Sequence, residues 1–302
     1  MADRRLQVFH AVAKHLSFTK AAEALFMTQP AVTFQIKQLE EQFNTRLFER
    51  GHGRISITPA GSVVLEYAER ILALSAELDT RLKEMTGEVA GLLLIGASTT
   101  IAEFLLPKVL GEFKSRYPKV MPRLFVANSE AVESRVAAHT LDIGFIEAPS
   151  HLQGLASDVC CSDELQAVCA PGHALARMKS VTPMQLMQYP FISREPGSGT
   201  REVTDRYFKE AGVAAESLDL IMELGSPEAL KGLAATGLGF TIMSRATVAN
   251  ELRLGLLAAV PLAPRLTRNL SVVYPKERFR SRLANTFIEF ARQRLAAGAA
   301  GN

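Results

Sequence analysis

The sequence lacks the long apolar runs of a membrane protein, and it is poor in cysteine. No apolar stretch in its 302 residues reaches the roughly 18 residues that cross a bilayer. Its charged, amphipathic start differs from a secretory signal, so we expect no membrane partner and a cytoplasmic location. Three cysteines are too few for a disulfide framework, and the histidines show no ligand spacing with one another or with the cysteines, so we expect no metal site.

Net positive charge is also small, at +3, but it is concentrated at one end of the chain. Residues 1–58 carry eight Lys or Arg against five acidic residues, whereas residues 59–90 carry three against six. A basic first unit followed by an acidic segment indicates that a polyanion would meet the first 58 residues.

Two short helices separated by an abrupt break are expected near the N-terminus. Ser17 and Thr19 are good caps for a short helix over KAAEAL, and Thr28 and Pro30 suit the start of the next helix. The spacing of four apolar residues predicts the buried face of that next helix: Val32, Ile36, Leu39 and Phe43. This helix-turn-helix pattern leaves polar and basic groups for the DNA major groove, and the candidate contacts are Thr28, Gln29, Pro30, Thr33, Phe34 and Lys37.

The segment TRLFERGHGRISITPAG predicts two strands joined by a glycine-rich turn. Arg50 and Arg54 lie near its tip, where a basic hairpin would act as the wing of a winged helix and contact DNA. On periodicity alone, the alternative is a three-helix core with a solvated outer face, and the basic hairpin favours DNA binding.

The stretch from Phe9 to Gly61 resembles the DNA-binding domain of the LysR-type transcriptional regulators. Many members carry Arg where this chain has Phe34, and an aromatic side chain there favours contacts with thymine methyl groups or sugars. The resemblance implies double-stranded promoter DNA as a partner and leaves RNA polymerase open as another. The matching positions are Phe9, Ser17-Phe18, Ala21-Ala22, Thr28-Gln29-Pro30-Ala31, Leu39-Glu40, Leu47-Phe48, Arg50 and Thr58-Pro59-Ala60-Gly61.

A long helix is expected to start at Pro59, after the cap Thr58, and to run to about residue 85–88. A heptad stripe on this helix predicts pairing with a second copy, and the alternative is packing against its own domain. In the resembling family the helix pairs two subunits, so we expect a dimer, with assembly into a tetramer left open. The stripe consists of Val64, Ile71, Leu78 and Met85, and the neighbouring positions are filled by Tyr67, Ala68, Leu74 and Leu82.

From Gly91 onwards, short apolar strands alternate with amphipathic helices, which predicts an α/β fold with open, mainly parallel sheets. One of these helices is expected from Ile101 to Tyr117. The resemblance implies two lobes hinged like a periplasmic binding protein. The expected domains are a winged helix-turn-helix at 1–58, a linker and dimerisation helix at 59–90, and an effector-binding domain at 91–302. Within this last domain, lobe one comprises 91–161 and 267–302, and lobe two comprises 162–266.

Three donor-rich turns follow predicted strands of this larger part, where ligands bind in open α/β sheets. The alternative for each turn is a plain helix cap or a plain connection between strand and helix. In the resembling family the corresponding loops build the ligand cleft. The candidate effector-binding residues are Ser98, Thr99, Thr100, Ser129, Glu147, Arg194, Glu195, Gly197, Ser198, Gly199, Thr200 and Ser226.

Hydroxyls, free backbone amides and arginine side chains suit a small anion. We therefore expect no cofactor but an effector such as sulfate, sulfite, a phosphate ester or a carboxylate. The segment REPGSGTRE resembles the family branch that regulates carbon fixation and sulfur assimilation.

The sequence thus predicts a DNA-binding regulator rather than an enzyme. No nucleophile elbow, P-loop or dinucleotide fingerprint occurs. The alternative is an α/β enzyme or a solute-binding protein with an accessory N-terminal domain. A peroxide-sensing disulfide is disfavoured, because adjacent Cys160 and Cys161 bridge poorly and Cys169, like them, lies on an apolar stretch.

Overall fold

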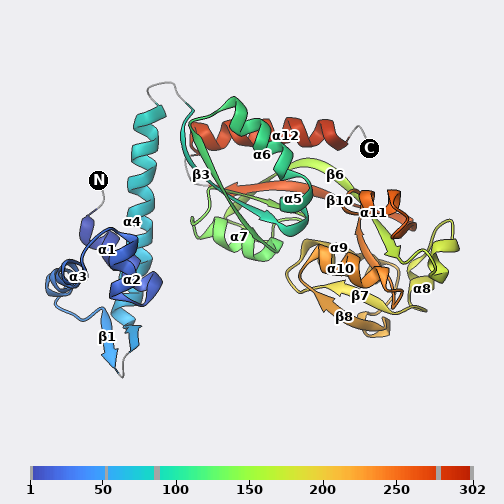
Figure 1. The fold of residues 1–302 in the computed structure, drawn as a ribbon, viewed down its shortest axis with the longest axis horizontal. Helices are drawn as coiled ribbons and strands as arrows, with labels where there is room; N and C mark the ends of the chain where they lie inside the picture. Colours follow the sequence, from blue (N-terminus) through green and yellow to red (C-terminus); the bar gives the residue numbers. More distant parts are fainter. Residues whose placement is uncertain (1–2, 52–53, 85–88, 277–279, 300–302) are drawn as a thin grey trace. The chain divides into compact units, whose positions relative to one another are not determined.

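The computed structural model describes residues 3–51, 54–84, 89–276 and 280–299 (Figure 1). The chain divides into two compact units, Met1–Glu88 and Val89–Asn302, which we call the DNA-binding unit and the effector unit. Within the described ranges, no helix has both the length and the apolar character that a bilayer-spanning segment requires.

Three helices, a hairpin and one long helix form the DNA-binding unit. Val32, Ile36 and Leu39 are buried as predicted, whereas Phe43 is 44% exposed, so its inward assignment is wrong. Phe43 is the last residue of its helix, before a left-handed Asn44, where the chain leaves the core. The elements are α1 (Arg4–His15), α2 (Phe18–Ala24), α3 (Gln29–Phe43), β1 (Phe48–Gly51), β2 (Arg54–Ile57) and α4 (Pro59–Glu84).

The predicted hairpin is present, and α3 holds it in place. Strands β1 and β2 are antiparallel, with Phe48 opposite Ile57. The carboxylate of Glu40 on α3 accepts hydrogen bonds from the backbone N–H groups of Leu47 (2.8 Å) and Phe48 (3.3 Å). The Phe48 ring packs on Phe9 with 5.2 Å between centroids, so the wing is part of the helical core.

Helix α4 begins as the sequence predicts, because the Thr58 hydroxyl accepts a hydrogen bond from the Gly61 N–H at 2.9 Å. Val64 packs into the core of its own unit, so its place in the dimer stripe is wrong, and Met85 lies outside the described residues. Ile71 and Leu78 of the predicted stripe are exposed, as are its predicted neighbours Tyr67 and Leu74, whereas the neighbour Ala68 is buried. With Val63 they form an exposed apolar stripe at three- and four-residue steps: Val63, Tyr67, Ile71, Leu74 and Leu78.

A six-stranded sheet with strand order β4-β3-β5-β10-β6-β9 supports the effector unit. Strand β3 pairs in parallel with β4 and β5, but β10 is antiparallel to β5 and β6, and β6 is antiparallel to β9. This sheet is therefore mixed, and the prediction of mainly parallel sheets is wrong for it, whereas the two-stranded sheet of Phe191–Arg194 and Leu220–Leu224 is parallel as predicted. The strands are β3 (Gly91–Ser98), β4 (Val120–Ala127), β5 (Ile143–Ile146), β6 (Leu155–Cys169), β9 (Thr241–Ser244) and β10 (Ala258–Pro275).

The helix expected from Ile101 to Tyr117 is broken into two at Leu105. Pro107 has no N–H group to continue the hydrogen-bond ladder of the first helix, so a new helix starts there. The remaining elements are α5 (Thr99–Phe104), α6 (Leu106–Arg116), α7 (Ser129–Ala137), α8 (Pro183–Leu186), β7 (Phe191–Arg194), α9 (Gly199–Glu210), β8 (Leu220–Leu224), α10 (Pro227–Ala235), α11 (Ala249–Arg253) and α12 (Arg282–Ala299).

The long strands β6 and β10 contribute to apolar clusters of both lobes. The largest cluster of lobe one takes Cys160 from β6 and Leu270 from β10, and the largest cluster of lobe two takes Leu165 and Leu266. Strand β6 therefore passes from lobe one to lobe two between residues 160 and 165, and β10 returns to lobe one between residues 266 and 270. These positions lie beside the predicted crossovers at 161/162 and 266/267. Figure 1 shows β6 and β10 running from the sheet near α12 towards the elements of the second lobe.

Candidate functional site

The residues predicted to contact DNA share the outer side of α3. Gln29, Pro30, Phe34 and Lys37 are exposed, and Gln29 Nε2 donates a hydrogen bond to Thr33 Oγ1 at 3.0 Å. The Phe34 side chain is 57% exposed, so an aromatic surface stands in the reading face.

Two details modify that face. Thr28 occupies the N-cap position of α3, but its side chain makes no capping hydrogen bond, so the expected cap is absent and Thr28 is exposed. Lys37 Nζ lies 3.7 Å from Glu41 Oε1, with both side chains mostly exposed. Such surface pairs contribute little, so Lys37 can turn towards a phosphate group.

Phe26 is an exposed aromatic residue that the sequence analysis missed. It lies in the turn before α3, is 98% exposed and has a φ of 54°, which is uncommon for a residue other than glycine. The sequence did contain a signal, because Phe26 is a large apolar residue that falls on none of the predicted buried helix faces.

For Arg50 and Arg54, the structure describes the backbone of β1 and β2 but not the side chains. Their predicted contacts with DNA stay predictions.

In the effector unit, several predicted residues surround a carboxylate of the protein itself. Glu147, which follows β5, is 1% exposed. Its Oε1 accepts a hydrogen bond from Ser98 Oγ at 2.7 Å, and its Oε2 accepts one from Thr200 Oγ1 at 2.8 Å. Thr100 also hydrogen-bonds to Glu147, whose backbone N–H lies 3.4 Å from Ser129 Oγ. An external anion would have to displace Glu147 to reach these hydroxyls.

Arg268 on β10 is the counter-ion of this carboxylate. Its side chain is 1% exposed, its Nη1 lies 2.5 Å from Glu147 Oε2, and its Nε lies 2.9 Å from Asp163 Oδ2. Arg268 was not among the residues predicted from the sequence, although a signal existed. Alternation along β10 places it on the same inward face as Leu266 and Leu270, where a charge needs a partner.

Both partners of this pair are charged at neutral pH. Burial alone would raise the pKa of Glu147, but Arg268 and the hydroxyls of Ser98, Thr200 and Thr100 hold that pKa below its usual value. Burial alone would lower the pKa of Arg268, but its two carboxylate partners hold that pKa above its usual value. Because Ser98 and Thr200 come from different lobes, this buried network joins them.

A second polar group lies around Arg194, which ends β7 and is 5% exposed. Its Nη2 lies 3.5 Å from Thr99 Oγ1 of lobe one and 3.4 Å from the Gly225 carbonyl, and its Nε pairs with Glu195 at 2.8 Å. Ser226 follows Gly225 and caps α10. Its Nη2 also donates a hydrogen bond to Glu195 Oε1 at 3.0 Å, and the hydrogen bonds of Arg194 to described residues all use Nε or Nη2.

Gly197 and Gly199 allow two loops to approach closely. A Cβ at Gly199 would lie 2.9 Å from Ser129 Oγ, and one at Gly197, where φ is +81°, would lie 2.9 Å from Asn128 Nδ2. Asn128 Nδ2 donates a hydrogen bond to the Pro196 carbonyl at 3.2 Å. The turn before α9 therefore packs directly on the start of α7.

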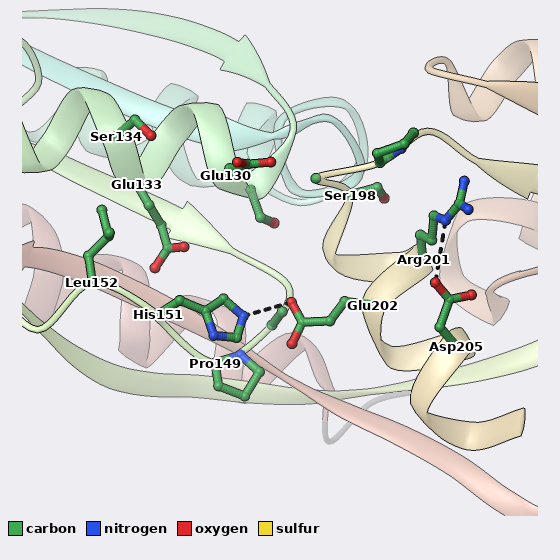
Figure 2. Close-up of a pocket in the computed structure, with 14 residues that line it drawn as sticks. Glu130, Glu133, Ser134, Pro149, His151, Leu152, Ser198, Arg201, Glu202 and Asp205 are labelled. Atoms are coloured by element: carbon green, nitrogen blue, oxygen red, sulfur yellow. Dashed lines mark hydrogen bonds and ion pairs between the residues drawn. The ribbon is translucent and has the colours of Figure 1, made fainter. Parts of the chain in front are cut away.

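A cavity of about 560 Å³ lies beside this contact (Figure 2). Its walls come from α7, the loop after β5 and the first turns of α9. His151 of the loop pairs with Glu202 of α9 at 2.9 Å, which raises the pKa of His151. Three predicted effector residues line this cavity, namely Ser129, Gly197 and Ser198.

The cysteines are buried or half-buried and form no disulfide. Burial raises the pKa of the Cys160 thiol to about 12 and those of Cys161 and Cys169 to about 11. Thiols of this kind stay protonated at neutral pH and react slowly, as expected for inert cysteines.

A winged helix-turn-helix joined to a two-lobed α/β domain defines the class of ligand-responsive DNA-binding regulators. The model of the bacterial regulatory helix-turn-helix proteins of the lysR family matches residues 4–62, and that of the LysR substrate binding domain matches residues 86–296. The chain belongs to the LysR family. It is a DNA-binding transcriptional regulator with an effector-binding domain, and not an enzyme.

Relatives agree with this assignment. A "Probable RuBisCO transcriptional regulator" of Porphyra purpurea is 34% identical over 94% of this chain and 90% of that protein. The regulatory domain of CcmR from Synechocystis PCC6803, solved in complex with 2-PG, is 27% identical. It covers 67% of this chain and 96% of its own, with a TM-score of 0.62. Full-length CbnR, solved with its target DNA, shares the fold at 23% identity and a TM-score of 0.70, over 97% of this chain and 99% of its own.

Proposed function

We propose that this regulator controls carbon-fixation genes, including those of RuBisCO, in response to a small anion bound between the lobes at Arg194. The Porphyra purpurea relative is a probable RuBisCO transcriptional regulator, which supports the gene class. The CcmR domain in complex with 2-PG supports an anionic effector. Sulfate, sulfite, phosphate esters and carboxylates are the ligand classes to be compared.

The observation that carries the effector site is the position of Arg194. Its buried guanidinium contacts Thr99 of the opposite lobe and pairs with Glu195 through Nε and Nη2, so Nη1 is the nitrogen left for a ligand among the described contacts. An anion on that nitrogen would touch both lobes. Because a ligand shifts an equilibrium only when it binds one arrangement better than another, contacts with both lobes couple binding to lobe movement.

Assembly and location form part of the proposal. The exposed stripe on α4 suits pairing with a second copy of the chain, so that two reading heads would bind two half-sites of a promoter. Two such dimers would form a tetramer, and RNA polymerase would be the partner in activation. The protein would act in the cytoplasm.

Thermal unfolding of the full-length protein against sulfate, sulfite, phosphate, phosphoglycerate and sugar bisphosphates tests the effector site. A ligand at about 100 times its dissociation constant adds about 2.7 kcal/mol of stability. We expect one anion to raise the melting temperature, and Arg194→Gln to abolish that shift. Arg206→Gln, at an exposed position on α9, is the matched control.

Two results would contradict the proposal. A shift that persists in Arg194→Gln would move the site elsewhere. An unchanged DNA footprint with and without the stabilising anion would remove the switching role while leaving DNA binding intact.

A further inference from the structure

The cavity between α7 and α9 is lined by more carboxylates than cationic side chains. Figure 2 shows Glu130 and Glu133 on α7 and Glu202 on α9 around it. Glu202 is paired with His151. Glu133 also helps to raise the pKa of His151, but within the described ranges no cationic side chain lies within ion-pair distance of Glu130 or Glu133. These two residues lie three positions apart and therefore on the same side of the helix.

The second cationic side chain of the cavity is occupied as well. Arg201 pairs with Asp205 on its own helix and with Glu223 on β8, and it donates a hydrogen bond to the Arg194 carbonyl at 3.0 Å. Arg201 is therefore shared between two carboxylates already and cannot neutralise the α7 pair.

Glu133 provides an independent indication of a missing ligand. The residue is only 4% exposed, and its Oε1 is fully buried without a hydrogen-bond partner. An ionised carboxylate without a partner is costly to bury, so native structures rarely keep one. Ser198 Oγ, in a residue 3% exposed, is a second buried atom without a partner, and both residues line the same cavity. Figure 2 shows them on opposite walls with Glu130 between them.

The chemistry of these walls selects the ligand. Unpaired carboxylates repel an anion, and the described residues contain no group of three or more side chains able to hold a metal ion. An ammonium group carries a positive charge and several N–H groups. These can donate hydrogen bonds to the two carboxylates and the hydroxyl. Pro149, Leu152 and Pro196 offer apolar walls for a short alkyl chain.

We propose that this cavity is a second ligand site, which binds a small alkyl diamine through Glu130, Glu133 and Ser198. One ammonium group pairs with the buried Glu133 carboxylate, and the second lies near Glu130 or Ser198. Since α7 and α9 belong to different lobes, the bound diamine links them. The site is separate from Arg194 and does not depend on the anionic effector.

Calorimetric titration of the full-length protein without DNA tests this site. The probes are 1,4-diaminobutane, butylamine and 1,4-butanediol, which have the same four-carbon chain and differ in charge, at constant ionic strength and pH 7.5. We expect the diamine to bind more tightly than the monoamine and the diol not to bind. Succinate is a fourth probe, because binding through Arg194 would favour this dianion and not the diamine.

Matched variants locate the binding. Glu133→Gln keeps the shape of the side chain and should weaken diamine binding about 10-fold or more, the equivalent of one charge-assisted hydrogen bond. Glu130→Gln and Ser198→Ala should weaken it less. Glu216→Gln, which removes an exposed acid outside the cavity, should leave it unchanged.

The proposal is overturned if the diamine does not bind to the wild-type protein. It is also overturned if the diol binds equally well, or if Glu133→Gln and Glu216→Gln bind the diamine with the same affinity, since that result would mean non-specific attraction to acidic surface. Should Glu133→Gln not fold, the Glu130→Gln and Ser198→Ala variants decide the same question.

Discussion

In the DNA-binding unit the side chains expected to meet the ligand stand outside an apolar core, whereas in the effector unit they are buried between two lobes. Among the described residues of the first unit, Thr58 is the one buried polar side chain. The second unit buries the Glu147–Arg268 pair together with Arg194 and Glu133. A rigid DNA-binding unit needs exposed groups that reach the DNA. An effector unit that responds to a ligand needs contacts that change when its lobes move.

The difference predicts how each unit responds to substitution. Removing an exposed polar group of α3 should change DNA binding without changing stability. Removing a buried polar group of the effector unit should change stability first, because its partner is left buried and unpaired.

The largest effect is expected for Arg268→Ala. Loss of this guanidinium leaves Glu147 and Asp163 buried without their cation, and breaking such a pair costs about 3–5 kcal/mol. Urea unfolding should show this loss, with faster hydrogen exchange in β6 and β10 but not in α3. Arg265→Ala removes an exposed arginine from the same strand and should stay close to wild type, because exposed ion pairs contribute little. If the two variants were equally stable, the buried network would not stabilise the contact between the lobes.

Phe34→Arg should alter sequence preference while leaving the stability of the protein unchanged. An arginine at this exposed position can bond bidentately to guanine, which is worth about 1–3 kcal/mol of discrimination at one base pair. Binding to a library of operator variants measures this change. If the preferred base stays the same, α3 does not present Phe34 to the groove.

Lys37→Ala should weaken binding to all operator sequences alike. Losing one phosphate contact lowers the slope of log affinity against log salt by about one. Titrations at several salt concentrations measure the slope. Lys209→Ala, which removes the same charge from an exposed position on α9, is the control and should leave the slope unchanged.

The smallest expected effect is an opposite response of the two units to pH. Burial lowers the pKa of His10 below 6.5, so its unit should lose stability as pH falls below 6.5. The hydrogen bond with Glu202 raises the pKa of His151 above 6.5, so its contribution is present below pH 6.5 and is lost as pH rises through the raised pKa.

Hydrogen exchange between pH 5.5 and 8.5 should resolve this difference. We expect His10→Gln to remove the acid-side change in α1, and His151→Gln to remove the alkaline-side change near α9. The same trend in both units would contradict the opposite shifts.

The elements that the sequence predicts correctly depend on local patterns. The spacing of Val32, Ile36 and Leu39 shows the buried face of α3, and Thr58 followed by proline shows the start of α4. The error at Phe43 occurs where the helix ends and its periodic pattern no longer faces the core. The break at Leu105 was readable from Pro107, because a proline disrupts a helix through its own backbone.

For the candidate site, the sequence identifies the polar loops but not their partners. Ser98, Thr100 and Thr200 were predicted as donors to an external anion, yet in the structure they hydrogen-bond to Glu147. Arg268 lies 121 residues from Glu147 along the chain, and no local pattern joins two such positions.

By itself, the sequence determined the family, the reading helix with its wing, and the α/β character of the larger unit, because periodicity, caps and turn residues act over a few positions. Only the tertiary structure decided which residues become hydrogen-bond, ion-pair or cavity partners of one another. The long antiparallel pairing of β6 with β10 brings Asp163 and Arg268 to Glu147, and the approach of α9 to α7 surrounds Glu133 with a cavity. These contacts depend on pairings between distant segments, whose geometry follows from the packing of the whole domain.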